Sequence, residues 1–302
     1  MALTLLEFAK TIQDTLLRGV IETFVGASDV LRYLPFEIID GNALSYNKED
    51  ALPGIAFRGL NEAYTESVGV VLPETEKLKI MGGDADSDLA YRKWAKGFDR
   101  HAYDVSAKAK AAALYFNKMF FDGDESTDPR QFYGLNKRLT GNQIIYAGTD
   151  GAALSEALLN QLIDAIDSQP DVLLMGKKTR RQINNLAKSS TILTIGKDEF
   201  GQAYEMYAGI PIGIIDKDNS GNIILDFDET RGTSNVTASI YAVKFGFFQY
   251  LSGIQSAPIE VRPLGEIDAK SAERTRIEWL MGIAMFHPRS AARLAGITAA
   301  VA

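Results

Sequence analysis

Residues 99–121 read DRHAYDVSAKAKAAALYFNKMFF, and the interpretation of the rest of the chain starts from this stretch. Alanine recurs through it, and alanine has the highest helix propensity of the natural residues. Gly123 ends the pattern, ahead of a turn-like run that closes with Pro129. We therefore predict one long helix, about 33 Å at ~1.5 Å per residue.

The chain before this helix has the character of strands. Residues 36–39, 55–58 and 67–72 are short apolar segments bounded by Gly and Pro, and the polar run 41–50 between them is expected to be exposed. Apolar residues are too few here for a separate core, and a two-stranded excursion is marginal alone. It forms either a surface hairpin on its own domain or an arm that packs on a neighbour.

The two ends of the chain extend this pattern. Apolar residues at helical spacing over 3–20 predict an amphipathic first helix, packed in its own core or against another subunit. After residue 135 helices and strands alternate. We expect helices over 155–166, 177–188 and 288–294, and strands over 171–175, 210–216, 222–227, 238–243, 259–262 and 275–280.

Composition excludes several classes of function. The 302 residues are 46% hydrophobic and 24% charged, as in an ordinary globular protein. The absence of cysteine removes disulfides, thiolate nucleophiles and zinc ribbons. A catalytic triad would have to use His101 or His287, the only histidines. A net charge of −7 gives no overall basic field for nucleic acid. No apolar run approaches the ~18 residues of a membrane span.

One motif resembles a metal site. Asp216-x-Asp218-x-Ser220-Gly221 looks like the opening of a calcium loop, but Phe227 stands where an EF-hand needs a bidentate Glu. The flanking segments also have the pattern of strands rather than helices. We therefore predict a polar hairpin turn without calcium, in which Asp218→Ala changes stability by no more than about 0.5 kcal/mol.

Two further charged stretches lack a catalytic pattern. Asp84, Asp86 and Asp88 alternate after two glycines and predict a flexible acidic turn. A basic cluster opens the helix expected over 177–188 and is either a solvated face or a site for an anion or an acidic neighbour. No combination of residues predicts an enzyme, a cofactor or a bound metal.

The order of elements resembles the major capsid proteins of tailed phages, whose Hong Kong 97-type fold encapsulin shells share. The likeness is one of layout and local sequence over nearly the whole chain. The segments that carry it are 34–42, 52–62, 132–135, 171–175, 238–246 and 274–279.

The resemblance implies an α+β fold with a defined division of the chain. An N-terminal arm would span 1–33 and an extended β-hairpin loop 34–82. A peripheral domain with the long helix as its spine would combine 83–134 with 259–290. An inserted α/β axial domain would span 135–258, with 291–302 returning to it.

The resemblance also implies a function. The chain would assemble as hexamers and pentamers into the icosahedral head of a tailed phage, contacting its double-stranded DNA non-specifically. It would be a virion protein, assembled in the host cytoplasm, with no enzymatic activity, cofactor or membrane contact. Some relatives carry a scaffolding segment before the arm; because this sequence starts at Met1 without one, a separate scaffolding protein is expected, with a portal and a possible decoration protein.

Two alternatives stay open on the sequence alone. One is an encapsulin-like shell that encloses cargo enzymes, and the other is an α/β enzyme that uses His101 or His287. Some relatives of the capsid family cross-link subunits through a lysine and an asparagine. Lys48, Lys77 and Lys79 lie in the matching region, but no partner Asn or catalytic Glu aligns with them, so that chemistry is not carried over.

Candidate interface residues are charged side chains in two places. On the late strands they alternate with Val261, Ile277 and Trp279, so one face carries both signs of charge and suits pairing across a subunit boundary. Arg276→Glu is then expected to spare folding and to block assembly. The candidates are Arg58, Glu62, Lys77 and Lys79 on the excursion, and Arg262, Glu266, Arg274, Arg276 and Glu278 on the late strands.

Overall fold

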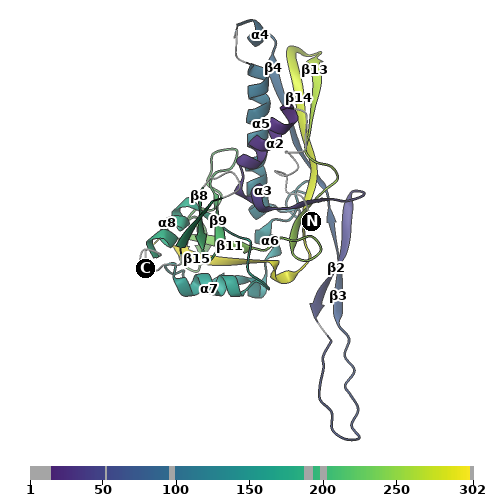
Figure 1. Ribbon diagram of the computed structural model, residues 1–302, viewed down its shortest axis with the longest axis vertical. Helices are drawn as coiled ribbons and strands as arrows, with labels where there is room; N and C mark the ends of the chain where they lie inside the picture. The colour runs from purple at the N-terminus through teal and green to yellow at the C-terminus, as the bar shows by residue number, and fades with distance from the viewer. Residues whose placement is uncertain (1–14, 52, 95–98, 187–192, 198–202, 300–302) are drawn as a thin grey trace.

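A computed structural model describes residues 15–51, 53–94, 99–186, 193–197 and 203–299. They form two sheets and a long helix, from which a two-stranded ribbon projects (Figure 1). The long helix and one sheet make an elongated upper half. The second sheet and its helices lie to one side of the lower half (Figure 1).

The upper half contains a five-stranded sheet in the order β1-β12-β14-β13, with β4 also paired to β14. β14 is antiparallel to β12, β13 and β4, and its pairing with β4 runs without interruption from Ala272–Asp88 to Met281–Lys79. The strands are β1 (Phe36–Ile38), β4 (Lys79–Asp88), β12 (Leu251–Gln255), β13 (Glu260–Ile267) and β14 (Lys270–Met285).

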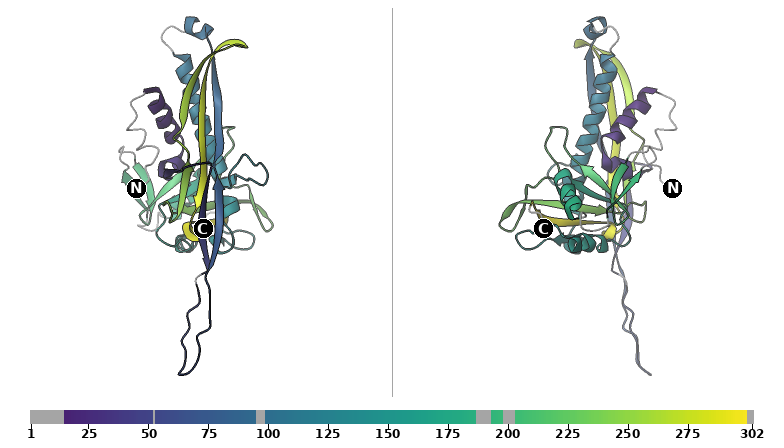
Figure 2. Two further views of the ribbon diagram at one scale, coloured as in Figure 1. Left: turned by 90° about the vertical axis from the view of Figure 1, so that its right-hand side faces the viewer. Right: turned by 60° about the vertical axis from the view of Figure 1, so that its left-hand side comes forward.

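The long helix α5 (Arg100–Asp122) runs alongside β4 and β14 (Figure 2). The Asp99 side chain caps its first turn by accepting from the Ala102 N–H, and the Gly123 N–H donates to the Met119 carbonyl at its end. The predicted helix is therefore confirmed to within a residue at each end. Its buried face combines small and aromatic side chains, which are Val105, Ala109, Ala113, Phe116 and Phe120.

An aromatic cluster joins the N-terminal segment to this sheet. Trp279 of β14 is 1% exposed, and its ring lies 4.7–5.9 Å from those of Phe24, Phe36 and Phe116. Its indole N–H donates to Gln255 Oε1 at 2.9 Å. Phe24 belongs to α2 (Thr15–Gly26), which precedes α3 (Asp29–Tyr33).

The second sheet has eight strands in the order β5-β15-β11-β6-β9-β8-β7, with β10 paired to β11. The helices α7 (Glu156–Asp164) and α8 (Lys177–Leu186) confirm two predicted helices. Its strands are β5 (Ile144–Tyr146), β6 (Val172–Gly176), β7 (Leu193–Lys197), β8 (Ala203–Tyr207), β9 (Ile210–Ile215), β10 (Glu229–Arg231), β11 (Ser234–Val243) and β15 (Ala291–Thr298). Short helical elements complete the chain: α4 (Ala90–Trp94), α6 (Leu135–Arg138), Gly141–Gln143 and Pro288–Ser290.

The ribbon consists of β2 (Ala43–Ala51) and β3 (Val70–Lys77), which pair antiparallel with each other alone. Residues 53–69 at its far end have no regular strand, so the prediction of a strand over 55–58 is wrong. The polar run 41–50 is also not simply exposed, because most of it forms β2 and Tyr46 is buried. Only Leu78 separates β3 from β4.

Three other expectations differ from the structure. Residues 288–294 form a single 3₁₀ turn followed by β15, because this apolar stretch pairs with β11 on one side and β5 on the other. The predicted acidic turn at Asp84 lies within β4, paired to β14. Residues 222–227 contribute one isolated bridge, Lys217 to Ile223, rather than a strand.

The predicted domain limits remain a proposal, with two observations bearing on them. β12 lies in the stretch assigned to the axial domain, yet it belongs to the five-stranded sheet. β15 places 291–298 in the eight-stranded sheet. Residues 3–14 of the predicted first helix lie outside the described residues, whereas Thr15–Gly26 are helical.

We predict that Trp279→Ala lowers the free energy of unfolding of the unassembled subunit by about 3–5 kcal/mol, because it empties the centre of the aromatic cluster. Trp279→Phe should cost less, since the ring contacts survive and only the bond to Gln255 is lost. Urea unfolding followed by circular dichroism measures both. Equal losses for the two variants would contradict the packing argument.

Candidate subunit interface

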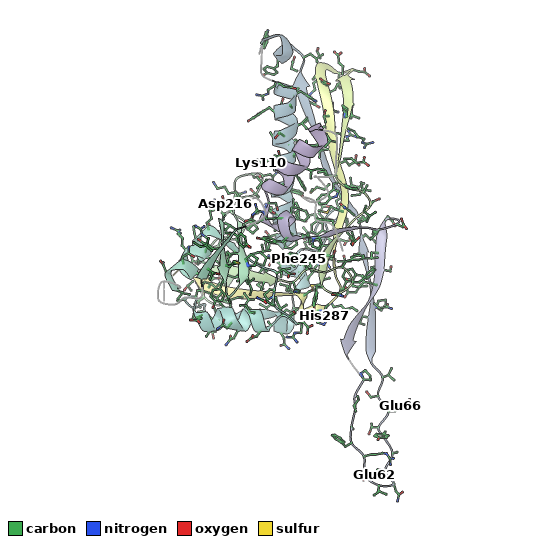
Figure 3. All side chains as sticks on the ribbon, in the orientation of Figure 1. Glu62, Glu66, Lys110, Asp216, Phe245 and His287 are labelled. Atoms are coloured by element: carbon green, nitrogen blue, oxygen red, sulfur yellow. The ribbon has the colours of Figure 1, made fainter. Side chains whose placement is uncertain are left out.

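The far end of the ribbon exposes apolar side chains. Ile55 and Leu60 are 98% and 96% exposed, and Phe57 is fully exposed. Tyr64 and Val68 are exposed as well. Figure 3 shows this segment, with Glu62 and Glu66 labelled, extending away from the remainder of the subunit. Exposed apolar groups that cluster in this way mark interaction surfaces. We call residues 53–69 the loop tip, and the ribbon with the loop tip the arm.

The loop tip has contacts of its own. The Gly59 N–H donates to Glu62 Oε2 at 2.7 Å, and the Arg58 guanidinium donates to the Glu62 carbonyl at 3.3 Å. The same guanidinium lies 5.2 Å from the centre of the Tyr64 ring. The predicted interface residues Arg58 and Glu62 are therefore brought together, and they shape the turn that presents the apolar side chains.

At the other end of the arm, one ion pair joins it to the body of the subunit. Arg138 of α6 donates to both carboxylate oxygens of Glu76 on β3, and also to the carbonyls of Tyr133 and Ile283 at 2.7 and 3.0 Å. The Arg138 and Glu76 side chains are 8% and 15% exposed. Burial alone would lower the pKa of Arg138, but the hydrogen bonds and charge of Glu76 hold it above its ordinary value.

The two predicted lysines at this base differ in their surroundings. Lys77 is exposed at the end of β3. Lys79 is mostly buried, and its Nζ donates to Glu125 Oε1 and to the Pro129 carbonyl, each at 2.8 Å. Lys79 therefore already has partners within its own subunit. The bond between Lys79 and Glu125 could not be predicted from the sequence, because the two residues are 46 positions apart.

The charged residues of β14 also pair within the subunit. Arg274 makes two hydrogen bonds to Asp86, at 2.7 and 2.8 Å, and Arg276 makes two to Asp84, at 2.7 and 2.9 Å. Hydrogen bonds from these arginines, their largest cause, lower the pKa of Asp84 and of Asp86. We call these four residues the charge ladder.

The predicted residues beside the charge ladder follow the same trend. Arg262 donates to Glu278 at 2.8 Å across β13 and β14. Glu266 is exposed and stands opposite Glu273 in the register. The alternation that suggested this face is confirmed, since Ile277 and Trp279 are buried. For Arg262, Arg274, Arg276 and Glu278, the partners expected on a neighbouring subunit are instead present in the same chain. An interface role for all of these residues, Glu266 included, remains a proposal.

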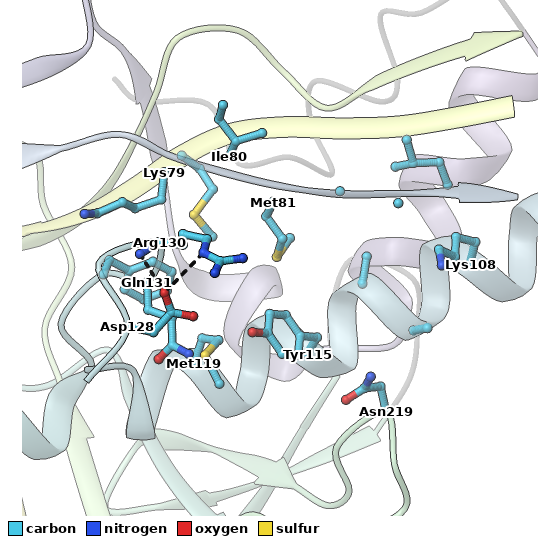
Figure 4. Close-up of a pocket in the computed structure, with 17 residues that line it drawn as sticks. Lys79, Ile80, Met81, Lys108, Tyr115, Met119, Asp128, Arg130, Gln131 and Asn219 are labelled. Carbon is cyan, nitrogen blue, oxygen red and sulfur yellow. Dashed lines mark hydrogen bonds and ion pairs between the residues drawn. The ribbon is translucent and has the colours of Figure 1, made fainter. Parts of the chain in front are cut away.

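A groove lies between α5 and β4, with a volume of about 420 Å³ (Figure 4). Its floor is apolar, formed by Met81, Ala112, Tyr115, Met119 and Met281. Three basic residues also line it, which are Lys79, Lys108 and Arg130. The arm of the same subunit extends away from α5, which forms one side of the groove (Figures 1 and 3). Asp128 lines the groove as well and pairs with Arg130, and Lys79 pairs with Glu125, so the rim is charged but largely neutralised within the subunit.

The calcium-like motif is a structural turn. The Asp218 side chain is 1% exposed, lies 3.0 Å from Lys118 Nζ and accepts from the Ser220 and Asn222 N–H groups at 2.8 Å. These bonds satisfy the side chain within the turn. Because Asp218 is buried and accepts several bonds, we expect Asp218→Ala to lower stability by more than the ~0.5 kcal/mol expected from sequence, by about 1–3 kcal/mol. No group of three or more acidic or histidine side chains able to hold a metal ion occurs in the part of the chain that the structure describes.

The basic cluster and the histidines also have structural partners. Lys177 pairs with Asp216, and Lys178 with Asp226. His101 Nε2 lies 2.8 Å from Thr275 Oγ1, and His287 Nδ1 accepts from the Arg289 N–H at the turn before β15. Both histidines therefore support the fold.

Comparison with known proteins identifies the fold. The SrpI encapsulin of Synechococcus elongatus PCC 7942 superposes with a TM-score of 0.66 at 12% identity, covering 89% of this chain and 87% of that one. The capsid of a native GTA particle gives 0.63 at 14% identity, covering 90% of each chain. The Mycobacterium phage Bobi structure gives 0.61 at 12% identity, covering 88% and 89%. No curated protein sequence matches.

These likenesses define the class: the chain has the Hong Kong 97-type fold of phage capsids and encapsulin shells. A sequence match separates the two, because residues 86–216 match the family described as SU10 major capsid protein. Together with the fold, this match indicates a non-enzymatic structural subunit of an icosahedral phage head. No helix among the described residues is long and apolar enough to cross a membrane.

The charge ladder predicts an acid-sensitive subunit. Because the pKa values of Asp84 and Asp86 are lower in the folded than in the unfolded state, their stabilisation is complete above the unfolded value of about 4. The stabilisation is lost as the pH falls through the pKa values that the two carboxyl groups have in the folded state. Arg276→Gln should lower stability at pH 6 and flatten its decline toward pH 2, as measured by urea unfolding of unassembled subunits.

Arg262→Gln is the matched control, because Arg262 bonds to Glu278 and is not paired with Asp84 or Asp86. An unchanged acid profile in Arg276→Gln would contradict the assignment. Arg276→Glu, expected from sequence to spare folding, should instead destabilise the subunit, because it brings a carboxylate beside Asp84.

Proposed function

We propose that the subunit assembles through its arm, each loop tip packing on a neighbouring copy within hexamers and pentamers of the phage head. The observation that carries this proposal is the exposure of the apolar side chains on residues 53–69. Contact of such a surface with water is unfavourable. Burying it on another copy stabilises the assembly by about 25 cal/mol per Å² of apolar area removed from water. Closed shells require contacts of this kind between different surfaces of identical subunits.

The groove between α5 and β4 is the receiving surface on the neighbouring copy. Its apolar floor suits Phe57 and Leu60, and Lys108 on its rim suits an acidic side chain of the loop tip. Glu66, exposed beside the apolar residues, supplies a negative charge without a role in the turn itself. The arm cannot fill the groove of its own subunit, since it extends in another direction (Figure 3).

The finer partners follow from the same proposal. The assembled shell encloses double-stranded DNA, and the subunit's net charge of −7 favours weak, non-specific contact with it. A separate scaffolding protein guides assembly, a portal occupies one vertex and a decoration protein binds the finished shell. The domain limits expected from sequence, with N-terminal arm, extended loop, peripheral and axial domains, belong to this proposal as well.

We predict that the double variant Phe57→Ser, Leu60→Ser yields folded subunits that do not form shells. The two side chains contact little in their own subunit, so thermal stability should stay within about 0.5 kcal/mol of the parent. Sedimentation and negative-stain microscopy report assembly. Val236→Ser, which removes an exposed apolar side chain from β11, is the control and should assemble normally. Normal shells from the double variant would contradict the proposal that the loop tip mediates assembly.

Cross-linking tests the groove directly. Because the natural chain has no cysteine, the pair Leu60→Cys and Lys108→Cys provides one thiol on the loop tip and one at the groove. Oxidation of assembled particles should give a ladder of covalent multimers on a denaturing gel. Leu60→Cys with Val236→Cys should give none. Monomers from both pairs, in particles that are otherwise normal, would place the loop tip elsewhere.

A further inference from the structure

The arm joins the body through a connection that could bend. Leu78 is the single residue between β3 and β4, and its N–H donates to the Asn42 carbonyl at 2.8 Å. A two-stranded ribbon has little stability of its own. Its direction therefore has to be fixed by contacts between ribbon side chains and the body.

Most contacts at this base do not fix a direction. Lys48 pairs with Glu74, but both residues belong to the ribbon. Tyr46 packs on Phe286 at 4.7 Å between ring centres within a small apolar cluster. Apolar contacts are non-directional, so they hold the ribbon against the body at a range of angles. The Tyr46 hydroxyl adds one bond to the Met285 carbonyl at 3.1 Å.

The Arg138–Glu76 pair is different in geometry. The guanidinium is planar, and the body holds it through the carbonyls of Tyr133 and Ile283. Its two remaining directions meet both oxygens of Glu76 on the ribbon. Paired parallel bonds of this type constrain orientation as well as distance. The pair is also largely buried, so bulk water competes little with these bonds.

We infer that the Arg138–Glu76 pair sets the direction of the arm relative to the body, which makes Arg138 a positioning residue for shell assembly. The inference rests on the proposed function of the arm. Buried ion pairs contribute little net stability compared with apolar replacements, and specifying one arrangement is their best-attested use. Here the arrangement specified is the angle at which one subunit reaches the next.

A small change in this angle moves the loop tip by a large distance, because the arm is long. Leu60 and Glu76 are 16 positions apart, so at ~3.3 Å per residue the tip lies up to roughly 50 Å from the pair. A rotation of about 10° at the base then moves the tip by about 9 Å over that lever. A shift of this size changes the angle between neighbouring subunits and hence the curvature of the shell. Arm direction and shell diameter are thereby coupled.

The experiment uses Glu76→Gln, which keeps the shape of the side chain but removes its charge and one acceptor oxygen. Arg138→Lys is the second variant, which keeps the charge but removes the planar fork. Glu74→Gln is the matched control, since Glu74 lies two residues away on the same strand and pairs within the ribbon. Spin labels at Ala63→Cys and Lys110→Cys report the distance from the loop tip to α5 in unassembled subunits.

We expect a broader tip-to-helix distance distribution in Glu76→Gln and Arg138→Lys, with an unchanged one in Glu74→Gln. Electron microscopy of particles should show loss of the single diameter in the first two variants alone. If one of them fails to fold by circular dichroism, the other decides. Folded variants with the parent distance distribution and diameter would overturn the inference, leaving the pair as a stabilising contact.

The two proposals fail differently. If the loop tip does not mediate assembly, the Phe57→Ser, Leu60→Ser variant forms normal shells and the proposed function is wrong. If the loop tip does mediate assembly but its direction is set elsewhere, that variant stays unassembled while Glu76→Gln forms shells of one diameter. The second result overturns only the role of Arg138.

Discussion

The register of β14 against its neighbours is the constraint on which the rest of the structure depends. Side chains alternate along a strand, so the register that buries Ile277 and Trp279 also sends Arg276 to the opposite face, beside Asp84. A slip of one residue would exchange the two sets and place guanidinium groups in the aromatic core. The core and the charge ladder therefore specify the same register from both faces of the sheet.

The pairing of β4 with β14 also fixes the place where the arm begins. The close approach of β4 to β14 requires a residue without a side chain at Gly82, where a Cβ atom would lie 2.4 Å from the Ile277 carbonyl oxygen. Because only Leu78 separates β4 from β3, the ribbon begins from a strand whose position is already fixed. In the proposed role of the arm, this fixed starting point and the buried ion pair that sets its angle together make the arm a defined lever. Shell geometry is thus connected to the packing around Trp279 through one continuous segment of chain.

Sequence reasoning succeeded where the determining signals are local. Alanine content, Asp99 and Gly123 are enough to locate α5, because propensity and caps act within a few residues. It failed at β15, where Pro288 and the following alanines are compatible with a helix and only the flanking strands make them a strand. It failed at β4 for the same reason, because Gly82, Gly83 and alternating aspartates have the composition of a turn until β14 supplies the partners.

In the candidate interface, too, local sequence patterns predict some features but do not reveal partners that are distant in the sequence. The exposed ribbon and its loop could be anticipated, because too few apolar residues surround them to form a core. The pairing of Arg276 with Asp84 could not, since 192 residues separate the two. Charged residues alternating on a strand indicate that a face is polar, but they do not reveal whether its partners lie in the same chain or in a neighbour.

That distinction changes the physical account of assembly. The charge ladder is neutralised within each subunit, so it gains little from a neighbour, and exposed ion pairs contribute only about 0–1 kcal/mol each. The apolar loop tip has no comparable cover among the described residues of its own chain. In the proposed assembly, hydrophobic burial of the loop tip is therefore the larger driving force for joining subunits. Since apolar burial has no preferred angle, it needs a directional contact at the base of the arm to produce a shell of one size.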